Sequence, residues 1–142
     1  MTMTTAARWA DVQELTKLPP LTFEVTLSTL AKDVAGTRDI YPIHHDAGFA
    51  RRNGARDIFL NTMWYQGLLG RYVTDWAGPD SFLRKLGFDM RGTNCPGDTL
   101  TVHGTVERKY AEGDRKLVDL TVHIDNQVQQ DSVIARMTVE LA

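Results

Sequence analysis

The stretch DIFLNTMWYQGLLGRYVTDW, residues 57–76, decides the fold predicted for this chain. It is the longest helical candidate in the sequence and would be about 30 Å long at the rise of an α-helix. Apolar and glycine residues recur at helical spacing along one face, and further apolar residues fill in around it. This pattern predicts a core helix buried on most of its sides. The helix is expected to end at Ala77-Gly78-Pro79, because Gly78 can adopt a left-handed conformation and Pro79 cannot continue a helix.

The last third of the chain alternates apolar and polar residues, which is the pattern of strands with one buried face. Three such strands are expected, at residues 99–110, 116–125 and 133–141. Residues 88–91 and 21–27 are expected to form a fourth and a fifth strand. Together the elements predict an α+β domain in which one antiparallel sheet packs on the long helix.

Composition and charge narrow the class of protein. The 142 residues suit one domain, expected at residues 8–142 behind a flexible tail at residues 1–7. A formal net charge of -2 without a basic run argues against nucleic acid or an anionic membrane as a partner. No stretch approaches the roughly 18 apolar residues of a membrane span, and the N-terminus has no signal-peptide pattern. Cys95 is the single cysteine, so no intramolecular disulfide is possible and a cytoplasmic location is expected.

A carboxylate and an imidazole lie five positions apart in the loop Asp39-Ile40-Tyr41-Pro42-Ile43-His44. Pro42 stiffens the chain between them, and the two side chains could share one water molecule if they converge. The alternative is an exposed loop without chemistry, which is the commoner outcome for an Asp and a His at this spacing alone. Asp46, just beyond, is expected to cap or brace the loop.

Three motifs, taken in order along the chain, resemble those of a known family. Asp39-x-x-Pro42-x-His44 is followed by Gln66-Gly67-Leu68-Leu69-Gly70 in the long helix and by Pro96-Gly97-Asp98-Thr99-Leu100 at the start of a strand. In this order they are similar to the MaoC-like, R-specific enoyl-CoA hydratases of the hot-dog fold. The likeness runs from Leu21 to the C-terminus. The fuller phrases at residues 37–39, 44–46, 57–59 and 71–79 resemble the small actinobacterial subunits that hydrate steroid side-chain enoyl-CoA esters.

The resemblance implies that Asp39 and His44 are the catalytic residues. Hydration of a 2-enoyl thioester needs a nucleophilic water at Cβ, a proton at Cα and stabilisation of the negative charge on the thioester oxygen. The pair could polarise the water and return a proton to the same face of the double bond, with Asp39 as the base and His44 as its partner and proton donor. The opposite assignment stays open, because coupled groups titrate as a pair.

Three further positions take roles from the same resemblance. The backbone N–H of Ile58 stands where the hydratases use a glycine amide for the thioester oxygen, and it would lie in the first turn of a helix that begins at Asp57. Gln66 stands at the position of a small hydroxyl residue and could hydrogen-bond the site, or it could be a polar residue satisfied locally within the helix. Tyr41 replaces an asparagine of the usual motif, so the hydrogen bonding of the loop is open.

The resemblance also implies the substrate class and the kind of assembly. An acyl-CoA thioester is the expected substrate, with CoA as part of the substrate and with no cofactor or metal. The gap between His44 and Ile58 is shorter than in short-chain hydratases, which implies room for a bulky acyl group. One hot-dog sheet leaves an edge and an apolar helix face uncovered, so the expected assembly is a homodimer or a heteromer with a second MaoC-like chain. Two other functions stay open: a hot-dog acyl-CoA thioesterase, and a non-catalytic acyl-CoA-binding subunit of a larger complex.

Overall fold

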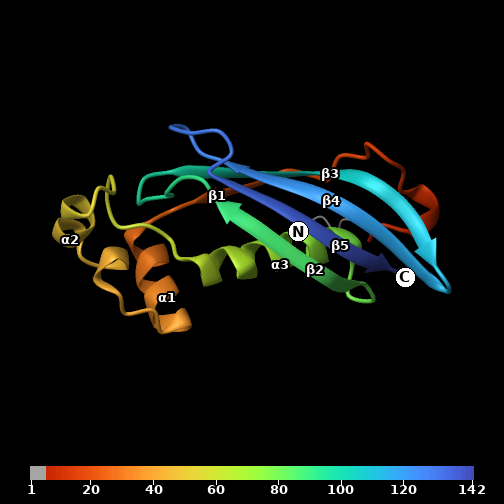
Figure 1. The fold of residues 1–142 in the computed structure, drawn as a ribbon, viewed down its shortest axis with the longest axis horizontal. Coiled ribbons are helices and arrows are strands. Elements are labelled where there is room, and N and C mark those ends of the chain that lie inside the picture. Colours follow the sequence, from red (N-terminus) through yellow and green to blue (C-terminus); the bar gives the residue numbers. More distant parts are fainter. Residues whose placement is uncertain (1–5) are drawn as a thin grey trace.

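The computed structural model describes residues 6–142, in which one five-stranded antiparallel sheet curves over a long helix (Figure 1). The strand order is β1-β3-β4-β5-β2. The strands are β1 (Leu21–Glu24), β2 (Phe82–Met90), β3 (Thr99–Glu112), β4 (Arg115–Asp125) and β5 (Val133–Leu141). This is the α+β hot-dog architecture that the sequence predicts.

The helices gather on one side of the sheet and beyond one of its ends. They are α1 (Leu27–Thr37), α2 (Ala47–Arg52) and α3 (Thr62–Ala77), with short 3-10 turns η1 (Trp9–Asp11) and η2 (Pro42–His44). The long helix α3 runs along the sheet, whereas α1 and α2 extend past the end where β1 ends and β3 begins (Figure 1). None of the helices in residues 6–142 is long and apolar enough to cross a membrane.

The core lies between the inner face of the sheet and the buried face of α3. Alternate residues of β3 and β4 are fully buried, among them Val102, Val106 and Val122, and they belong to one apolar cluster with Tyr65 and Leu69 of α3. Alternation over most of each strand therefore places one side of the strand in the core, as predicted.

The predicted start of the long helix is wrong. The helix begins at Thr62 rather than at Asp57, and Asn61 caps it by accepting a hydrogen bond from the Trp64 N–H at 2.9 Å. The residues before the cap are drawn away from helical geometry, because the Leu60 N–H donates to the Asn94 carbonyl oxygen at 3.1 Å. The predicted end is confirmed: α3 stops at Ala77, and Gly78 follows with a φ of 89°.

The two outer strands also differ from the predicted ranges. Strand β2 begins at Phe82, well before the predicted residue 88, and a bulge between Leu83 and Lys85 breaks the alternation that would have marked it. Strand β1 ends at Glu24, because Thr26 already serves as the N-cap of α1. Of the tail predicted at residues 1–7, residues 1–5 lie outside the described part, and the Ala7 N–H donates to the Trp76 carbonyl oxygen at 2.9 Å.

Candidate active site

The predicted pair converges at the end of the molecule that α1 and α2 occupy. Asp39 follows α1, and His44 is the last residue of η2, which Pro42 opens. The 3-10 turn folds the chain back, so that the Nε2 atom of His44 lies 3.3 Å from an Oδ atom of Asp39. The His44 side chain is buried and that of Asp39 is partly exposed, with 26% of its surface accessible. The pair is therefore reachable from outside through Asp39.

A hydrogen bond to the backbone fixes the tautomer of His44. Its Nδ1 atom lies 2.7 Å from the carbonyl oxygen of Phe59, which can only accept, so Nδ1 carries a proton. The Phe59 ring also packs edge-on against the imidazole at 5.1 Å between ring centroids. Nε2 is thus the ring nitrogen that exchanges protons at the site, and its position is held by the segment that precedes α3.

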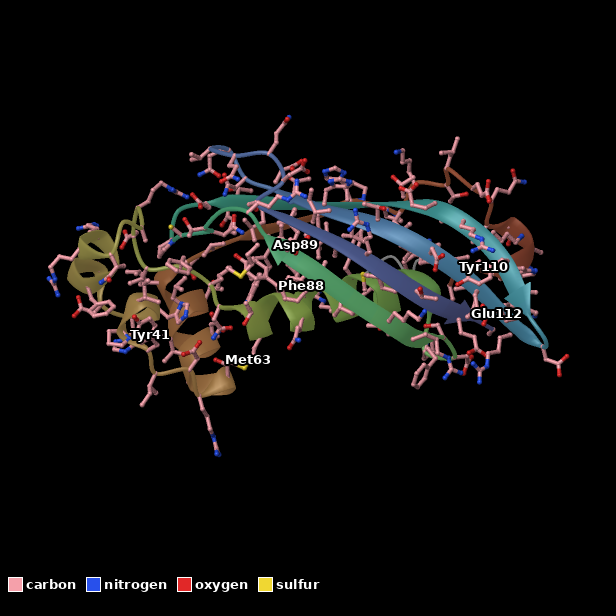
Figure 2. All side chains as sticks on the ribbon, in the orientation of Figure 1. Tyr41, Met63, Phe88, Asp89, Tyr110 and Glu112 are labelled. Carbon is pink, nitrogen blue, oxygen red and sulfur yellow. The ribbon has the colours of Figure 1, made fainter. Side chains whose placement is uncertain are left out.

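The Asp39 carboxylate is oriented by the backbone of its own loop. One Oδ atom accepts a hydrogen bond from the Tyr41 N–H at 3.3 Å, while the other faces His44. The Tyr41 side chain turns away to pack edge-on against Phe49 of α2, and it lies at the outer end of the molecule (Figure 2). Tyr41 therefore contributes its main chain to the pair, whereas its ring stabilises the loop against α2.

Contrary to the prediction from the sequence, Ile58 does not lie in the first turn of a helix. Ile58 lies in the extended segment before α3, and its N–H donates to the carboxylate of Asp57 at 2.8 Å. The unpaired amides of a helix end belong instead to the first turn at Thr62. In that turn the Trp64 N–H is already taken by the Asn61 side chain.

Gln66 lies on the exposed side of α3, one turn after Thr62. Within residues 6–142 its side chain makes no hydrogen bond to Asp39 or His44, nor is it buried within the helix packing. Asp46, by contrast, caps α2 by accepting from the Phe49 N–H at 2.9 Å, so its predicted bracing role is confirmed.

Sequence reasoning missed a buried polar network next to the pair. The Thr37 hydroxyl accepts from the Asn61 side-chain amide at 2.8 Å and donates to the Asp33 carbonyl oxygen at 2.6 Å. The Asp33 carboxylate accepts from the Asn61 N–H at 3.0 Å. A signal was present: Leu30, Asp33 and Thr37 share the helical spacing of one face of α1, so a carboxylate and a hydroxyl lie on its buried side.

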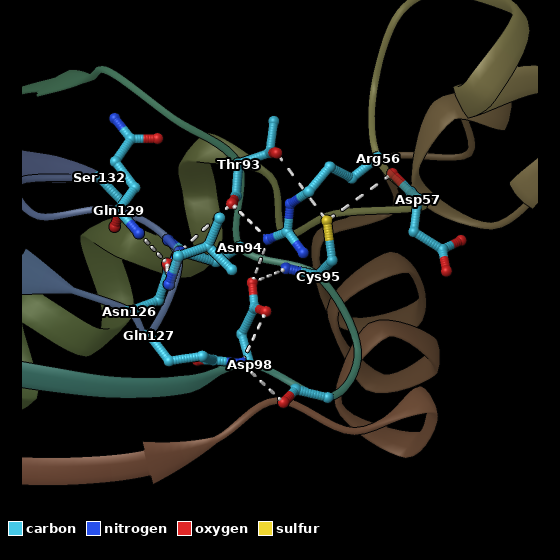
Figure 3. A network of polar contacts seen from close by, with 12 residues as sticks. Arg56, Asp57, Thr93, Asn94, Cys95, Asp98, Asn126, Gln127, Gln129 and Ser132 are labelled. Carbon is cyan, nitrogen blue, oxygen red and sulfur yellow. Dashed lines mark hydrogen bonds and ion pairs between the residues drawn. The ribbon is translucent and has the colours of Figure 1, made fainter.

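A second network holds the segment before α3 from the side of the sheet (Figure 3). The Arg56 guanidinium contacts the Asp98 carboxylate at 2.6 Å, and Asp98 also accepts from the Cys95 N–H at 2.8 Å. The Asn94 side chain donates to the Tyr65 hydroxyl at 2.8 Å. Cys95 is buried in this network, and burial raises the pKa of its thiol, which lowers the reactivity of this cysteine.

The sequence is related to a protein of known activity. It is 36% identical over 89 residues to the 3-oxo-4,17-pregnadiene-20-carboxyl-CoA hydratase beta subunit of Mycobacterium tuberculosis, a match that covers 63% of this chain and 69% of that subunit. The chain belongs to the MaoC-like hydratases of the hot-dog fold. No family model matches the sequence.

Solved structures place this MaoC-like chain in the same fold. A chain of the ChsH1-ChsH2 complex from Mycobacterium tuberculosis superposes with a TM-score of 0.84 at 29% identity, covering 92% of this chain and 98% of that one. The (R)-hydratase from A. caviae involved in PHA biosynthesis superposes with a TM-score of 0.81 at 20% identity, covering 93% of this chain and 98% of that one. The MaoC-like dehydratase from Rhodospirillum rubrum gives 0.79 at 18% identity, covering 96% and 97%. At these lower identities the last two show the fold alone.

The MaoC-like chain presents an apolar hollow on the outward face of α3. Its volume is about 280 Å³, and Phe23, Met63, Trp64, Gly67, Leu68 and Arg71 line it. Met63 lies on this face, in the first turn of α3 (Figure 2). Since Met63 is 42% exposed, this face is open to solvent in the single chain.

Proposed function

We propose that this chain is the catalytic subunit of an (R)-specific enoyl-CoA hydratase, which adds water to a trans-2-enoyl-CoA thioester. The observation that carries the proposal is the pair of Asp39 and His44, 3.3 Å apart in a MaoC-like fold, with His44 oriented by Phe59. The relationship to a named acyl-CoA hydratase subunit supports the same reaction class.

The proposed chemistry uses one water that contacts both side chains from the same side. The Asp39 carboxylate takes a proton from this water while the oxygen of the water bonds to Cβ. The electrons of the double bond move towards the thioester oxygen. The imidazolium of His44 then gives the proton on Nε2 to Cα. Transfer of the proton from Asp39 to His44 restores both groups, so that the balance is one water added. Since both groups lie on one side of the water, addition to one face of the double bond follows.

The thioester oxygen needs hydrogen-bond donors as its negative charge develops. The Ile58 N–H can serve if the Asp57 carboxylate releases it when the thioester binds. The amides in the first turn of α3 are the alternative donors, because helix-end N–H groups lack partners within the helix.

A bulky, steroid side-chain-like acyl group is the proposed substrate, and a second MaoC-like chain is the proposed partner. The related subunit is named for a pregnadiene carboxyl-CoA substrate, and the superposed chain comes from a two-component complex. In this chain the nine-residue edge strand β2 and the apolar hollow on α3 are surfaces that a partner would cover. A homodimer would use the same surfaces. The cytoplasmic location stays a prediction.

The decisive experiment is hydration of enoyl-CoA esters of increasing acyl size, with and without a co-encoded MaoC-like chain. The wild-type chain is compared with Asp39→Asn, and loss of the base is expected to lower kcat by about 10²-fold or more. Asp46→Asn is the matched control, because asparagine caps a helix as well as aspartate and Asp46 does not contact the pair.

The readouts separate the three candidate functions. Hydration consumes the absorbance of the conjugated thioester and leaves the thioester intact, whereas a thioesterase releases free CoA. An Asp39→Asn rate equal to that of wild type would reject the catalytic assignment and leave a binding subunit. Release of CoA at the rate of enoyl loss would favour the thioesterase.

A further inference from the structure

Asp33 is a buried carboxylate that the proposed mechanism does not use. It lies on α1 with 3% of its surface exposed, and one of its carboxylate oxygens, Oδ1, has no hydrogen-bond partner among residues 6–142. Burying an ionisable group with an unsatisfied oxygen lowers stability, so its presence calls for a physical reason.

The other oxygen of Asp33 holds the segment that orients His44. It accepts the Asn61 N–H at 3.0 Å, two residues after the Phe59 carbonyl that accepts from His44 Nδ1. Thr37 makes a second link between α1 and Asn61, since its hydroxyl bonds both to the α1 backbone and to the Asn61 side chain. Asp33 is therefore linked to His44 through a single stretch of three residues.

The charges that act on Asp33 are those of the catalytic pair. Burial raises the pKa of the Asp33 carboxyl, the Asn61 N–H and His44 act to lower it, and Asp39 acts to raise it. From α3 the facing group is the neutral Asn61, and the direct ion-pair partner of His44 is Asp39. Within residues 6–142 no hydrogen bond or ion pair joins Asp33 to His44, so the imidazole acts on Asp33 through space and only in its protonated form.

We propose that Asp33 is a positioning residue of the reaction centre, which anchors the Phe59–Asn61 segment and whose negative charge favours the imidazolium form of His44. This inference rests on the proposed hydration reaction, in which His44 must hold a proton before it can deliver it to Cα. Burial of the carboxylate lowers the stability of the fold, but its charge increases the fraction of His44 that is protonated and ready to react.

The test is Asp33→Asn, which keeps an acceptor for the Asn61 N–H and removes the charge. We expect kcat to fall about tenfold with KM changed less than about twofold, because the lost interaction acts on the proton-transfer step. Both limbs of the pH profile of kcat are expected to move to lower pH, since the remaining pair holds its proton less strongly. A residue with only a structural role would leave kcat and both limbs unchanged in a folded Asp33→Asn protein, and that result would overturn the proposal. Asp46→Asn again serves as the control.

A second measurement needs neither an Asp33 variant nor activity. The carboxyl carbon of Asp33 is followed by NMR through a pH titration in the wild-type chain and in His44→Gln. Its midpoint is expected to rise when the imidazolium is removed, and an unchanged midpoint would refute the coupling. If the wild-type protein did not hydrate any enoyl-CoA, the proposed function would fail while this titration still decided whether Asp33 senses His44.

Discussion

His44 donates its Nδ1–H to the carbonyl oxygen of Phe59 across 2.7 Å, a contact that spans the loop after α1 and the segment before α3. Because this bond fixes one ring nitrogen, the other is left facing Asp39. The geometry of the pair therefore depends on where the Phe59–Asn61 segment is held.

His44→Gln is expected to lower kcat for hydration by about 10²-fold or more, because the proton donor is lost. The neighbouring His45 provides the matched control: its Nε2 lies 3.0 Å from the Ile40 carbonyl oxygen, and its ring does not contact Asp39. His45→Gln should lower the free energy of unfolding by about 1 kcal/mol through the lost hydrogen bond, with kcat within about threefold of wild type. Steady-state kinetics and urea denaturation check both variants, and equal losses of activity in the two would contradict the assignment.

Asn61→Ala is expected to lower the stability of the protein. The variant removes the N-cap of α3 and the donor to Thr37, which together should decrease the free energy of unfolding by about 1–3 kcal/mol. Asn61→Ser keeps a capping oxygen without the amide donor, so it should recover about 1 kcal/mol of the loss. Urea denaturation of the three proteins measures the difference. Equal unfolding free energies for the Ala and Ser variants would show that the cap contributes nothing.

Arg38→Gly is expected to stabilise the protein. Arg38 ends α1 in the left-handed region with φ of 57°, where a side chain is unfavourable and glycine is not. The gain should be about 0.5–1 kcal/mol, reduced by the greater freedom of glycine in the unfolded chain. Arg38→Val is the control with the opposite expected sign. It should lower the stability of the protein, because a β-branched residue fits this conformation poorly. Thermal unfolding of the two variants tests the sign, and a lower Tm for Arg38→Gly than for Arg38→Val would refute the explanation.

The stability conferred by Asp33→Asn should depend on pH. Burial raises the pKa of the folded-state carboxyl above its unfolded value of 3.8, so the folded protein binds the proton more tightly than the unfolded chain does. Wild-type stability from this group is thus fully present below pH 3.8 and is lost as pH rises through the folded-state pKa. The Asp33→Asn variant does not lose this stability. Its free energy of unfolding should exceed that of wild type by about 1–3 kcal/mol near neutral pH, and the difference should become smaller as the pH is lowered. Urea denaturation at a series of pH values tests this, and parallel stability curves for the two proteins would contradict it.

The sequence predicted the parts of the fold that repeat along the chain. Strands β3, β4 and β5 alternate over most of their length, and Gly78-Pro79 marks the end of α3, so both could be predicted from residue types alone. The start of α3 could not be predicted in this way, because apolar residues continue back to Ile58. The helix does not extend there because the Leu60 N–H bonds to the distant Asn94. Strand β2 was hidden in part by its bulge.

The pair itself was predicted, whereas the groups that support it were not. Asp39 and His44 lie within one loop, so their spacing and Pro42 suffice to suggest convergence. The groups that support the pair come from α1 and from the segment before α3. No local pattern links Asp33 to Asn61, which lie 28 residues apart. Gln66, whose place was inferred from resemblance, is exposed on α3 in the single chain, and its role at the site stays a prediction.

The segment of Phe59, Leu60 and Asn61 is tied on one side to Asn94 and on the other to Asp33. Because Leu60 is fully buried and its amide is bonded to the loop that enters β3, this amide should exchange its hydrogen with solvent only when a large part of the domain opens. Loss of activity on heating would then coincide with melting of the sheet, with no earlier local loosening of the catalytic loop.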